Sequence, residues 1–434
     1  MKTAHSLAFA CAVVLGIPSH SFALGIRIAD QDARATARGN AFTATADNPS
    51  AIYYNAAGIT QLYQDSLSQP VTLSLGGKGV ATPQSTADTG VQVRAGVYAI
   101  SLESKFSPAN GGASFDSKHT TQAAASFYAT WKPTAAPIVF GLGIYSPYGF
   151  GLQYGDDASF RNLALSGSVQ YLTIHPVIAW QATSSLSLAA GPTFNYGKVN
   201  LKQGILSRHD FFQFDGEGWA VGWTASAMWR PHAMHSFGLT YRSQTDIEFD
   251  GDARTSYHSF DVATPFGPFK IPGQDTNERA SAGIKFPQNV VLGYSFRPTD
   301  RWNFEVNVDW TDWDNLNDVN LRKKSGDVRL PFQWQSSLFY EFGASYRFDS
   351  GLTASLGYIY SENSVPNATF NPIVPDSNRH ILSAGLGGKW RNWNYDLAYQ
   401  YAHGPERTVA NGTSADGAYK FDSHALSLSL GTRF

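Results

Sequence analysis

Apolar and polar side chains alternate along many stretches of the chain. From Trp302 to Trp310 every second residue is apolar, and the residues between them are polar or charged. Successive side chains of a β-strand point to opposite faces, so such a stretch predicts a strand with one apolar and one polar face. Residues 186–196 and 351–360 repeat the pattern. The alternation therefore predicts a protein built largely of amphipathic strands.

Breaks in the alternation divide the chain into about fourteen strands separated by two kinds of connection. We expect strands near residues 92–106, 120–131, 138–154, 163–182, 186–203, 217–230, 236–250, 285–297, 302–314, 336–348, 351–361, 379–390, 393–403 and 421–434. Tight turns alternate with long polar loops, which we expect near 107–119, 204–216, 251–284, 315–335, 362–378 and 404–420. Short turns at one end and long loops at the other are typical of outer-membrane barrels.

The final stretch, from His424 to Phe434, indicates how such a sheet closes. It alternates leucine with small residues and ends on an aromatic side chain. In a barrel the leucines would face hydrocarbon, and pairing with the first strand would leave no unpaired edge. Tryptophans at both ends of the apolar face of 302–310 fit the aromatic girdles of these barrels. The predicted fold class is all-β: a 14-stranded antiparallel transmembrane β-barrel.

Composition agrees with an envelope protein and argues against a nucleic-acid partner. The 32 basic and 34 acidic residues give a net charge of −2, which offers no surface for tracking phosphates. Charged residues make up 15 % of the chain, against about 25 % in an ordinary soluble domain. The mean hydropathy is −0.24. No apolar run of about 18 residues, the length of a membrane helix, follows residue 23.

The first 23 residues predict an export signal and exclude several kinds of chemistry. Lys2 precedes the apolar stretch Leu7–Ile17, and small residues suggest cleavage near Ala23. The single cysteine, Cys11, lies inside this signal. The mature chain would therefore have no disulfide, no thiolate nucleophile and no cysteine-ligated zinc. We expect no metal and no cofactor, and no enzyme, although a lipase with a dispersed Ser-His-Asp triad stays open.

A non-alternating segment precedes the first predicted barrel strand. Residues 24–62 are rich in alanine, glycine and threonine, yet Ile52 and Ile59 require burial. A periplasmic tail would not need such residues, so we predict a plug, or hatch, that fills the lumen. Residues 63–90 would be a connection or insertion, and residues 91–434 the barrel.

Three stretches resemble one known family over essentially the whole mature chain. They are "LGIRIADQDARATARGNAFTATADNPSAIYYNAAGIT" from Leu24, "GEGWAVGWTASAMWRP" from Gly216 and "SENSVPNATFNPIVPDSNRHILSAGL" from Ser361. The chain is similar to the outer-membrane transporters of long-chain fatty acids and aromatic hydrocarbons (FadL/TodX type). The resemblance implies an integral outer-membrane barrel, expected to be a monomer, that passes a fatty acid, alkane or arene without energy input. Its partners would be that ligand and outer-membrane lipid.

The resemblance also assigns residues to the hatch and the ligand pocket. The hatch residues would be Asn48, Pro49, Asn55, Ala56, Ala57 and Gly58. Asn55, Ala56 and Ala57 stand where the family usually has Asn-Pro-Ala. The pocket residues would be Leu24, Ile26, Ile28, Lys202 and Gln335. Lys202 matches one of the family's basic carboxylate anchors, whereas the other position holds Gln335, so the presence of a carboxylate on the cargo stays open.

The third predicted strand contains residues that a regular sheet tolerates poorly. They are Pro147, Tyr148, Gly149, Phe150 and Gly151. Proline cannot donate to a ladder, and glycine weakens it. The stretch could be a bulge that helps the barrel to curve. It also matches the family's kinked strand, where an opening in the wall would release cargo sideways into the bilayer. A general diffusion porin and a surface adhesin or receptor are the alternative functions.

Overall fold

The computed structural model describes residues 26–63, 89–134, 136–265 and 267–434. The predicted signal peptide, Leu24 and residues 64–88 lie outside the described residues. The wall strands are β1 (Gly90–Pro108), β3 (Thr120–Lys132), β4 (Ile138–Tyr145), β5 (Gly149–Gln153), β6 (Ser166–Gln181), β7 (Leu186–Gly204), β8 (Phe211–His232), β9 (His235–Arg242), β10 (Thr245–Tyr257), β13 (Gln274–Phe286), β14 (Asn289–Phe296), β15 (Trp302–Thr311), β16 (Asp318–Lys323), β17 (Val328–Pro331), β18 (Ser337–Arg347), β19 (Thr353–Ser361), β20 (Arg379–Trp390), β21 (Trp393–Val409) and β22 (Gly417–Arg433). The remaining elements are β2 (Phe115–Asp116), β11 (Phe260–Thr264), β12 (Gly267–Ile271), α2 (Ala33–Thr36), α3 (Ala51–Tyr54) and the 3₁₀ helices η1 (Ala56–Tyr63), η2 (Trp313–Asn315) and η3 (Asn367–Thr369).

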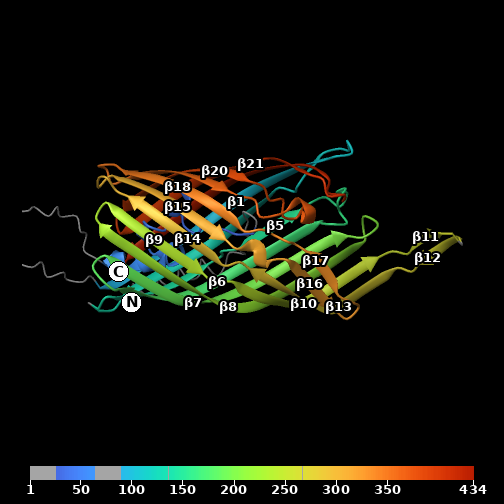
Figure 1. Cartoon of the computed structure of the whole chain (residues 1–434), viewed down its shortest axis with the longest axis horizontal. Coiled ribbons are helices and arrows are strands. Elements are labelled where there is room, and N and C mark those ends of the chain that lie inside the picture. The colour runs from blue at the N-terminus through green and yellow to red at the C-terminus, as the bar shows by residue number, and fades with distance from the viewer. Residues whose placement is uncertain (1–25, 64–88, 135, 266) are drawn as a thin grey trace, which may run out of the picture.

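The wall closes on itself as an antiparallel barrel of fourteen strands (Figure 1), which confirms the predicted fold class. Five of these strands consist of two successive elements: β4 with β5, β9 with β10, β13 with β14, β15 with β16 and β17 with β18. The last strand, β22, pairs with the first, β1, from Gln92↔Arg433 to Pro108↔Gly417. Closure thus gives the backbone of both terminal strands hydrogen-bonding partners.

The alternation of β15 separates the two faces of the wall. Val306 and Val308 on the outer face are 43 % and 42 % exposed, whereas Glu305 and Asp309 on the inner face are 2 % exposed. A water-soluble sheet would place these faces the other way round, with its apolar side buried. The outward apolar face and inward polar face are those of a strand that meets lipid.

Several strands extend beyond the limits expected from the sequence. The connection between β7 and β8 is only residues 205–210, where a loop near 204–216 was predicted. Much of 251–284 continues β10 and β13 and adds the hairpin β11–β12, which projects beyond the barrel in Figure 1. In these extensions small buried residues such as Ala253 and Ala282 face inward and charged residues such as Asp252 face outward, so the sequence lacks the outward apolar face by which the other strands were predicted. Sequence periodicity therefore missed strands that backbone pairing still forms.

Residues 26–63, here called the lumen segment, lie inside the barrel at the end with the short turns (Figure 1, blue). The helix α2 contacts β20, β21 and β22, whereas η1 contacts β6, β7 and β8, so the segment touches opposite sides of the wall. No helix in the described part of the chain is long and apolar enough to cross a membrane.

The inner face of β15 holds the lumen segment through three polar side chains. Asp309 accepts two hydrogen bonds from the Arg27 guanidinium, at 2.8 and 2.6 Å, in a pair that is almost fully buried. Asn307 donates to the Asn40 carbonyl at 3.2 Å. Glu305 accepts from the Ala44 amide at 2.7 Å. Because a buried charge needs a partner, these contacts fix the segment against one strand.

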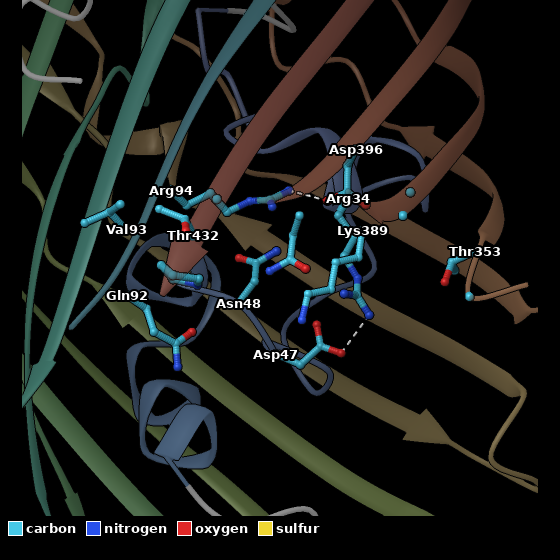
Figure 2. Close-up of a pocket in the computed structure, with 16 residues that line it drawn as sticks. Arg34, Asp47, Asn48, Gln92, Val93, Arg94, Thr353, Lys389, Asp396 and Thr432 are labelled. Carbon is cyan, nitrogen blue, oxygen red and sulfur yellow. Dashed lines mark hydrogen bonds and ion pairs between the residues drawn. The ribbon is translucent and has the colours of Figure 1, made fainter. Parts of the chain in front are cut away.

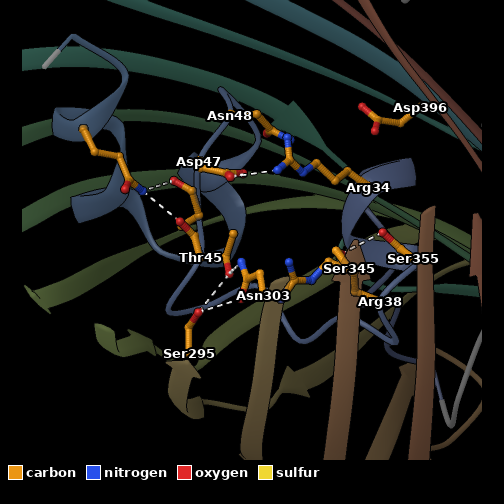
Figure 3. A network of polar contacts seen from close by, with 12 residues as sticks. Arg34, Arg38, Thr45, Asp47, Asn48, Ser295, Asn303, Ser345, Ser355 and Asp396 are labelled. Atoms are coloured by element: carbon orange, nitrogen blue, oxygen red, sulfur yellow. Dashed lines mark hydrogen bonds and ion pairs between the residues drawn. The ribbon is translucent and has the colours of Figure 1, made fainter. Parts of the chain in front are cut away.

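Further polar contacts connect the lumen segment to neighbouring strands (Figure 3). Asn303 of β15 donates to the Thr45 hydroxyl at 2.9 Å and accepts from Ser295 of β14 at 2.8 Å. On the other side of the lumen, Arg94 of β1 pairs with Asp32.

Backbone packing reinforces these polar contacts. A Cβ atom added at Gly357 of β19 would collide with the backbone nitrogen of Gly39, so segment and wall touch there without side chains between them. The lumen segment is therefore fixed by both close packing and hydrogen bonds.

The Arg27–Asp309 pair allows a test of this attachment. Asp309→Ala would leave the Arg27 guanidinium buried and unpaired, and we expect the free energy of unfolding to fall by about 3–5 kcal/mol. Urea titration of the protein in detergent would measure it. The matched control is Asp349→Ala, which breaks the Arg301–Asp349 pair of a short turn, where the side chains are 49 % and 82 % exposed. That change should be within about 1 kcal/mol. Equal losses in the two variants would contradict the role of the buried pair.

Candidate ligand cavity and wall gap

A cavity of about 330 Å³ lies at the end of the barrel with the long loops. Ile26 of the lumen segment contributes to its lining, and β6, β7, β8, β13, β16 and β17 supply most of its sides. Residues 365–374, between β19 and β20, complete it together with Asn411 and Thr413 from the loop between β21 and β22. The volume is at the lower end of the roughly 300–1,000 Å³ of small-molecule sites.

The lining of this cavity is apolar and carries no charge. None of its 28 lining residues is Asp, Glu, Lys, Arg or His. The polar members are Ser168, Asn200, Gln203, Thr369, Asn371, Asn411 and Thr413. Apolar surface removed from water on both sides contributes about 25 cal/mol per Å² to binding. The cavity is therefore suited to a hydrophobic small molecule.

Two loops that line the cavity are held in place by charged groups outside it. Arg407 donates to the Val365 carbonyl at 2.6 Å and to the Asn363 side chain at 3.1 Å, which fixes the loop after β19. Asp416 accepts from the backbone amides of Asn411 at 2.7 Å and Gly412 at 3.0 Å. These amide donors hold the pKa of the Asp416 carboxyl below its ordinary value.

The wall has a gap beside the cavity, between β3 and β5. The β3–β4 ladder runs from Trp131↔Phe140 and ends at Phe127↔Ile144. Beyond it β5 pairs with β6 but forms no ladder with β3 among the described residues. Across the gap, the Gln122 side chain donates to the Gly151 carbonyl at 3.3 Å, and the Lys118 amide donates to the Gln153 carbonyl at 2.8 Å.

The lumen segment occupies the place of the missing strand pairing. The Ile28 amide donates to the Pro147 carbonyl at 2.8 Å, and the Gly149 amide donates to the Ile26 carbonyl at 2.7 Å. Gln31 reaches both edges, because its side chain donates to the Ser146 carbonyl at 2.7 Å and its carbonyl accepts from Ser126 of β3 at 2.9 Å. The gap is thus bridged from the lumen side.

The five residues singled out in the third strand have different places. The break covers residues 146–148 and so includes Pro147 and Tyr148. Gly149 and Gly151 lie within β5 and pair regularly with β6, so they do not interrupt that ladder. Phe150 lines the cavity and packs against the cluster that contains Ile28.

Tyr148 anchors the break inside the barrel. Its ring lies 5.1 Å from those of Tyr171 and Phe286, and its hydroxyl donates to the Pro287 carbonyl at 2.9 Å. The chain between β4 and β5 is therefore drawn inward by an aromatic side chain.

The expected pocket residues are only partly brought together. Ile26 lines the cavity, and Ile28 packs below it with Tyr98 and Ile100. The Lys202 ammonium lies 4.7 Å from the centre of the Phe211 ring, and neither Lys202 nor Gln335 belongs to the cavity lining. Gln335 is exposed.

The alternation along β7 indicates which of its side chains face the lumen. Of the four β7 residues that line the cavity, Val199, Leu201 and Gln203 lie on the face of the strand opposite Lys202, and Asn200 lies on the same face as Lys202.

The expected hatch residues lie in two groups within the lumen segment. Asn48 accepts from the Ser50 amide at 2.8 Å, and Asn48 and Pro49 line a second cleft. Asn55 precedes η1 and donates to the Thr43 carbonyl at 2.8 Å and the Ala227 carbonyl at 3.0 Å. The other three, Ala56, Ala57 and Gly58, are buried in the first turns of η1.

The second cleft, of about 230 Å³, lies at the end with the short turns and is strongly polar (Figure 2). Arg34 and Asp47 form an ion pair at 2.8 Å in it, and Arg94 pairs with Asp396 at 2.7 Å. Lys389 also lines it. The lumen segment thus meets an apolar cavity at Ile26 and a polar cleft at residues 34 and 47–49. No group of three or more His, Cys, Asp or Glu side chains in the described part of the chain could hold a metal ion.

Comparison with known proteins gives consistent matches. A family model described as "Outer membrane protein transport protein (OMPP1/FadL/TodX)" matches residues 14–434. The long-chain fatty acid transport protein of Escherichia coli O6:H1 (strain CFT073) is 24 % identical over 342 residues, covering 70 % of this chain and 76 % of the relative.

Solved structures share the fold at low sequence identity. A Pseudomonas aeruginosa FadL homologue has a TM-score of 0.76 at 15 % identity and covers 94 % of this chain and 99 % of its own. The Pseudomonas putida toluene transporter TodX has a TM-score of 0.67 at 14 % identity, covering 96 % and 98 %.

Adjacent residues of β7 provide a test of the cavity. Leu201→Asp would place a carboxylate in the apolar cavity, and we expect a fluorescent, uncharged hydrophobic probe to bind at least about tenfold more weakly, since a buried unpaired charge costs more than the 1.4 kcal/mol of a tenfold change. Titration of the purified protein in detergent would measure this. Lys202→Asp, on the opposite face, is the control and should leave binding unchanged. Similar losses in both variants would show that the probe binds elsewhere.

Proposed function

The chain belongs to the outer-membrane transport protein family (OMPP1/FadL/TodX), and on that premise we propose that it carries hydrophobic small molecules into the cell by passive diffusion and releases them sideways through the gap between β3 and β5. The observation that carries the proposal is the gap itself, which lies next to an apolar cavity. The proposed role is transport, with no catalytic step.

The proposed path begins at the long loops, which face the cell exterior in barrels of this kind. A hydrophobic molecule enters the cavity above the lumen segment, where apolar surface replaces water. Phe150 lies between the cavity and the gap, since it lines the cavity and belongs to β5. Leu102, Gly151 and Leu152 surround a smaller space that shares Phe150 with the cavity. The space also borders the buried Arg379–Asp376 ion pair, but most of its lining is apolar, which supports movement from the cavity toward the wall.

Two features disfavour a path through the lumen to the periplasm. The lumen segment is hydrogen-bonded to β15 and contacts strands on opposite sides of the barrel. Below it lies the polar cleft with its ion pairs. A hydrophobic molecule gains nothing in such a cleft, whereas it gains about 0.8 kcal/mol per CH₂ on entering hydrocarbon. In this proposal the lumen segment acts as the hatch that closes the axial route, and the same feature argues against a general porin.

A reversible crosslink across the gap tests lateral release. With Gln122→Cys and Gly151→Cys joined by a cleavable bifunctional thiol reagent, we expect uptake of a labelled hydrophobic compound by cells to fall at least about tenfold, equivalent to 1.4 kcal/mol. Cleavage of the reagent should restore uptake. Binding of the fluorescent probe to the purified crosslinked protein should remain within about twofold, equivalent to 0.4 kcal/mol, because the cavity is untouched.

The control crosslink joins two strands that are already paired. Leu356 and Ala384 are direct partners on the outer face of β19 and β20, so Leu356→Cys with Ala384→Cys should leave uptake unchanged. Normal uptake by protein that is fully crosslinked between positions 122 and 151 would refute lateral release at this gap.

A further inference from the structure

We infer that the cavity selects uncharged hydrophobic molecules and excludes the ionised form of a fatty acid. This inference rests on the proposed function and adds to it the chemical class of the cargo. It is carried by the cavity lining, in which 21 of 28 residues are apolar and none is charged. A carboxylate moved into such surroundings loses its water shell and finds no opposite charge.

One buried guanidinium close to the cavity is already paired. Arg379 lines the small space that adjoins the cavity at Phe150 and Ile373. Its guanidinium forms an ion pair with Asp376, and both side chains are 3 % exposed. The guanidinium also lies 4.4 Å from the centre of the Phe421 ring. The pair is neutral as a unit, and the adjoining space of about 20 Å³ has room for about one water molecule and not for a carboxylate group with its alkyl chain.

A second cation near the cavity, Arg407, is hydrogen-bonded to the loop after β19. The Arg407 guanidinium lies 4.8 Å from the centre of the Phe370 ring. Phe370 lines the cavity and Arg407 does not. The Arg407 guanidinium donates to Asn363, Val365, Asn367 and Asp376. A carboxylate would have to displace these hydrogen bonds and open the loop that closes the cavity.

Lys202 does not supply the missing charge. It follows Leu201 on β7, and neighbouring residues of a strand point to opposite faces. Its ammonium lies over Phe211 rather than in the cavity. What the cavity offers instead is hydrogen-bonding groups without charge, among them Ser168, Gln203 and Asn371. Such groups accommodate a hydrocarbon, an ester or an alcohol without requiring an anion.

A ligand series of constant chain length tests the inference. Dodecane, dodecan-1-ol, methyl dodecanoate and dodecanoate would compete with the uncharged fluorescent probe on the purified protein in neutral detergent. The Leu201→Asp variant would report displacement that does not involve the cavity. At pH 8 we expect the three neutral ligands to compete at concentrations at least about tenfold lower than dodecanoate. Near pH 4, where a carboxylic acid becomes neutral, dodecanoic acid should approach the ester, whose competition should not change.

The outcomes separate this inference from the proposed function. Dodecanoate that competes as well as the ester at pH 8 would overturn the inference and leave hydrophobic transport standing. Failure of all four ligands to displace the probe would overturn both. A preference for neutral ligands together with undiminished uptake by the crosslinked gap would support the inference and refute lateral release.

A gain-of-binding variant provides a second, independent readout. Gln203→Arg places a guanidinium in the cavity and should tighten dodecanoate binding at pH 8 at least about tenfold, with no gain for methyl dodecanoate. The control is Lys202→Gln, which removes the neighbouring charge on the other face and should change neither ligand. Dodecanoate binding that weakens in Lys202→Gln would reinstate Lys202 as an anchor and contradict the inference.

Discussion

Backbone amide and carbonyl groups in hydrocarbon have no water to bind, and this constraint governs the whole molecule. The barrel satisfies it by closure, since β22 pairs with β1 along its length. The third strand is the exception, because β4 pairs with β3 but its continuation β5 does not. There the partners come from the lumen segment, through Ile26, Ile28 and Gln31. The break and the segment therefore belong together, because the segment supplies hydrogen-bonding partners to residues 146–149, where the third strand leaves its ladder with β3.

The same strand geometry explains how a lumen segment with few large apolar side chains is retained. A wall strand must be apolar toward lipid, and its other face is free to be polar. On β15 that inner face carries Glu305, Asn307 and Asp309, each of which binds the lumen segment. Because successive side chains point to opposite faces, one strand presents apolar side chains to lipid and polar side chains to the lumen. The polar side chains are the ones that bind the lumen segment.

The sequence predicted the fold better than the site, for a physical reason. Alternation on strands that meet lipid is enforced by the bilayer, so the fourteen-stranded barrel was predicted from it and is confirmed. The family was predicted separately, from the resemblance of three stretches of sequence, and is also confirmed. Strands that do not present an apolar face to lipid lack this constraint, and the prediction of a loop over residues 251–284 is wrong for β11, β12 and parts of β10 and β13. The cavity is assembled from seven or more elements far apart in the chain, and only its β7 face was readable from alternation. Lys202 was assigned by resemblance at a position whose side chain, by strand parity, lies on the other face.

A gap in the barrel wall lowers the free-energy barrier for a molecule that passes between the lumen and the bilayer. It does not change the free energy of that molecule outside the cell or in the membrane. Nothing in the proposed route couples movement to a chemical step, so forward and reverse passage share the same path and the same barrier. The direction of net flow is then set by where the molecule is consumed or trapped. In a cell that uses such a protein, net uptake would continue only as long as metabolism removes the cargo from the membrane. Once that removal stopped, cargo could leave through the same gap.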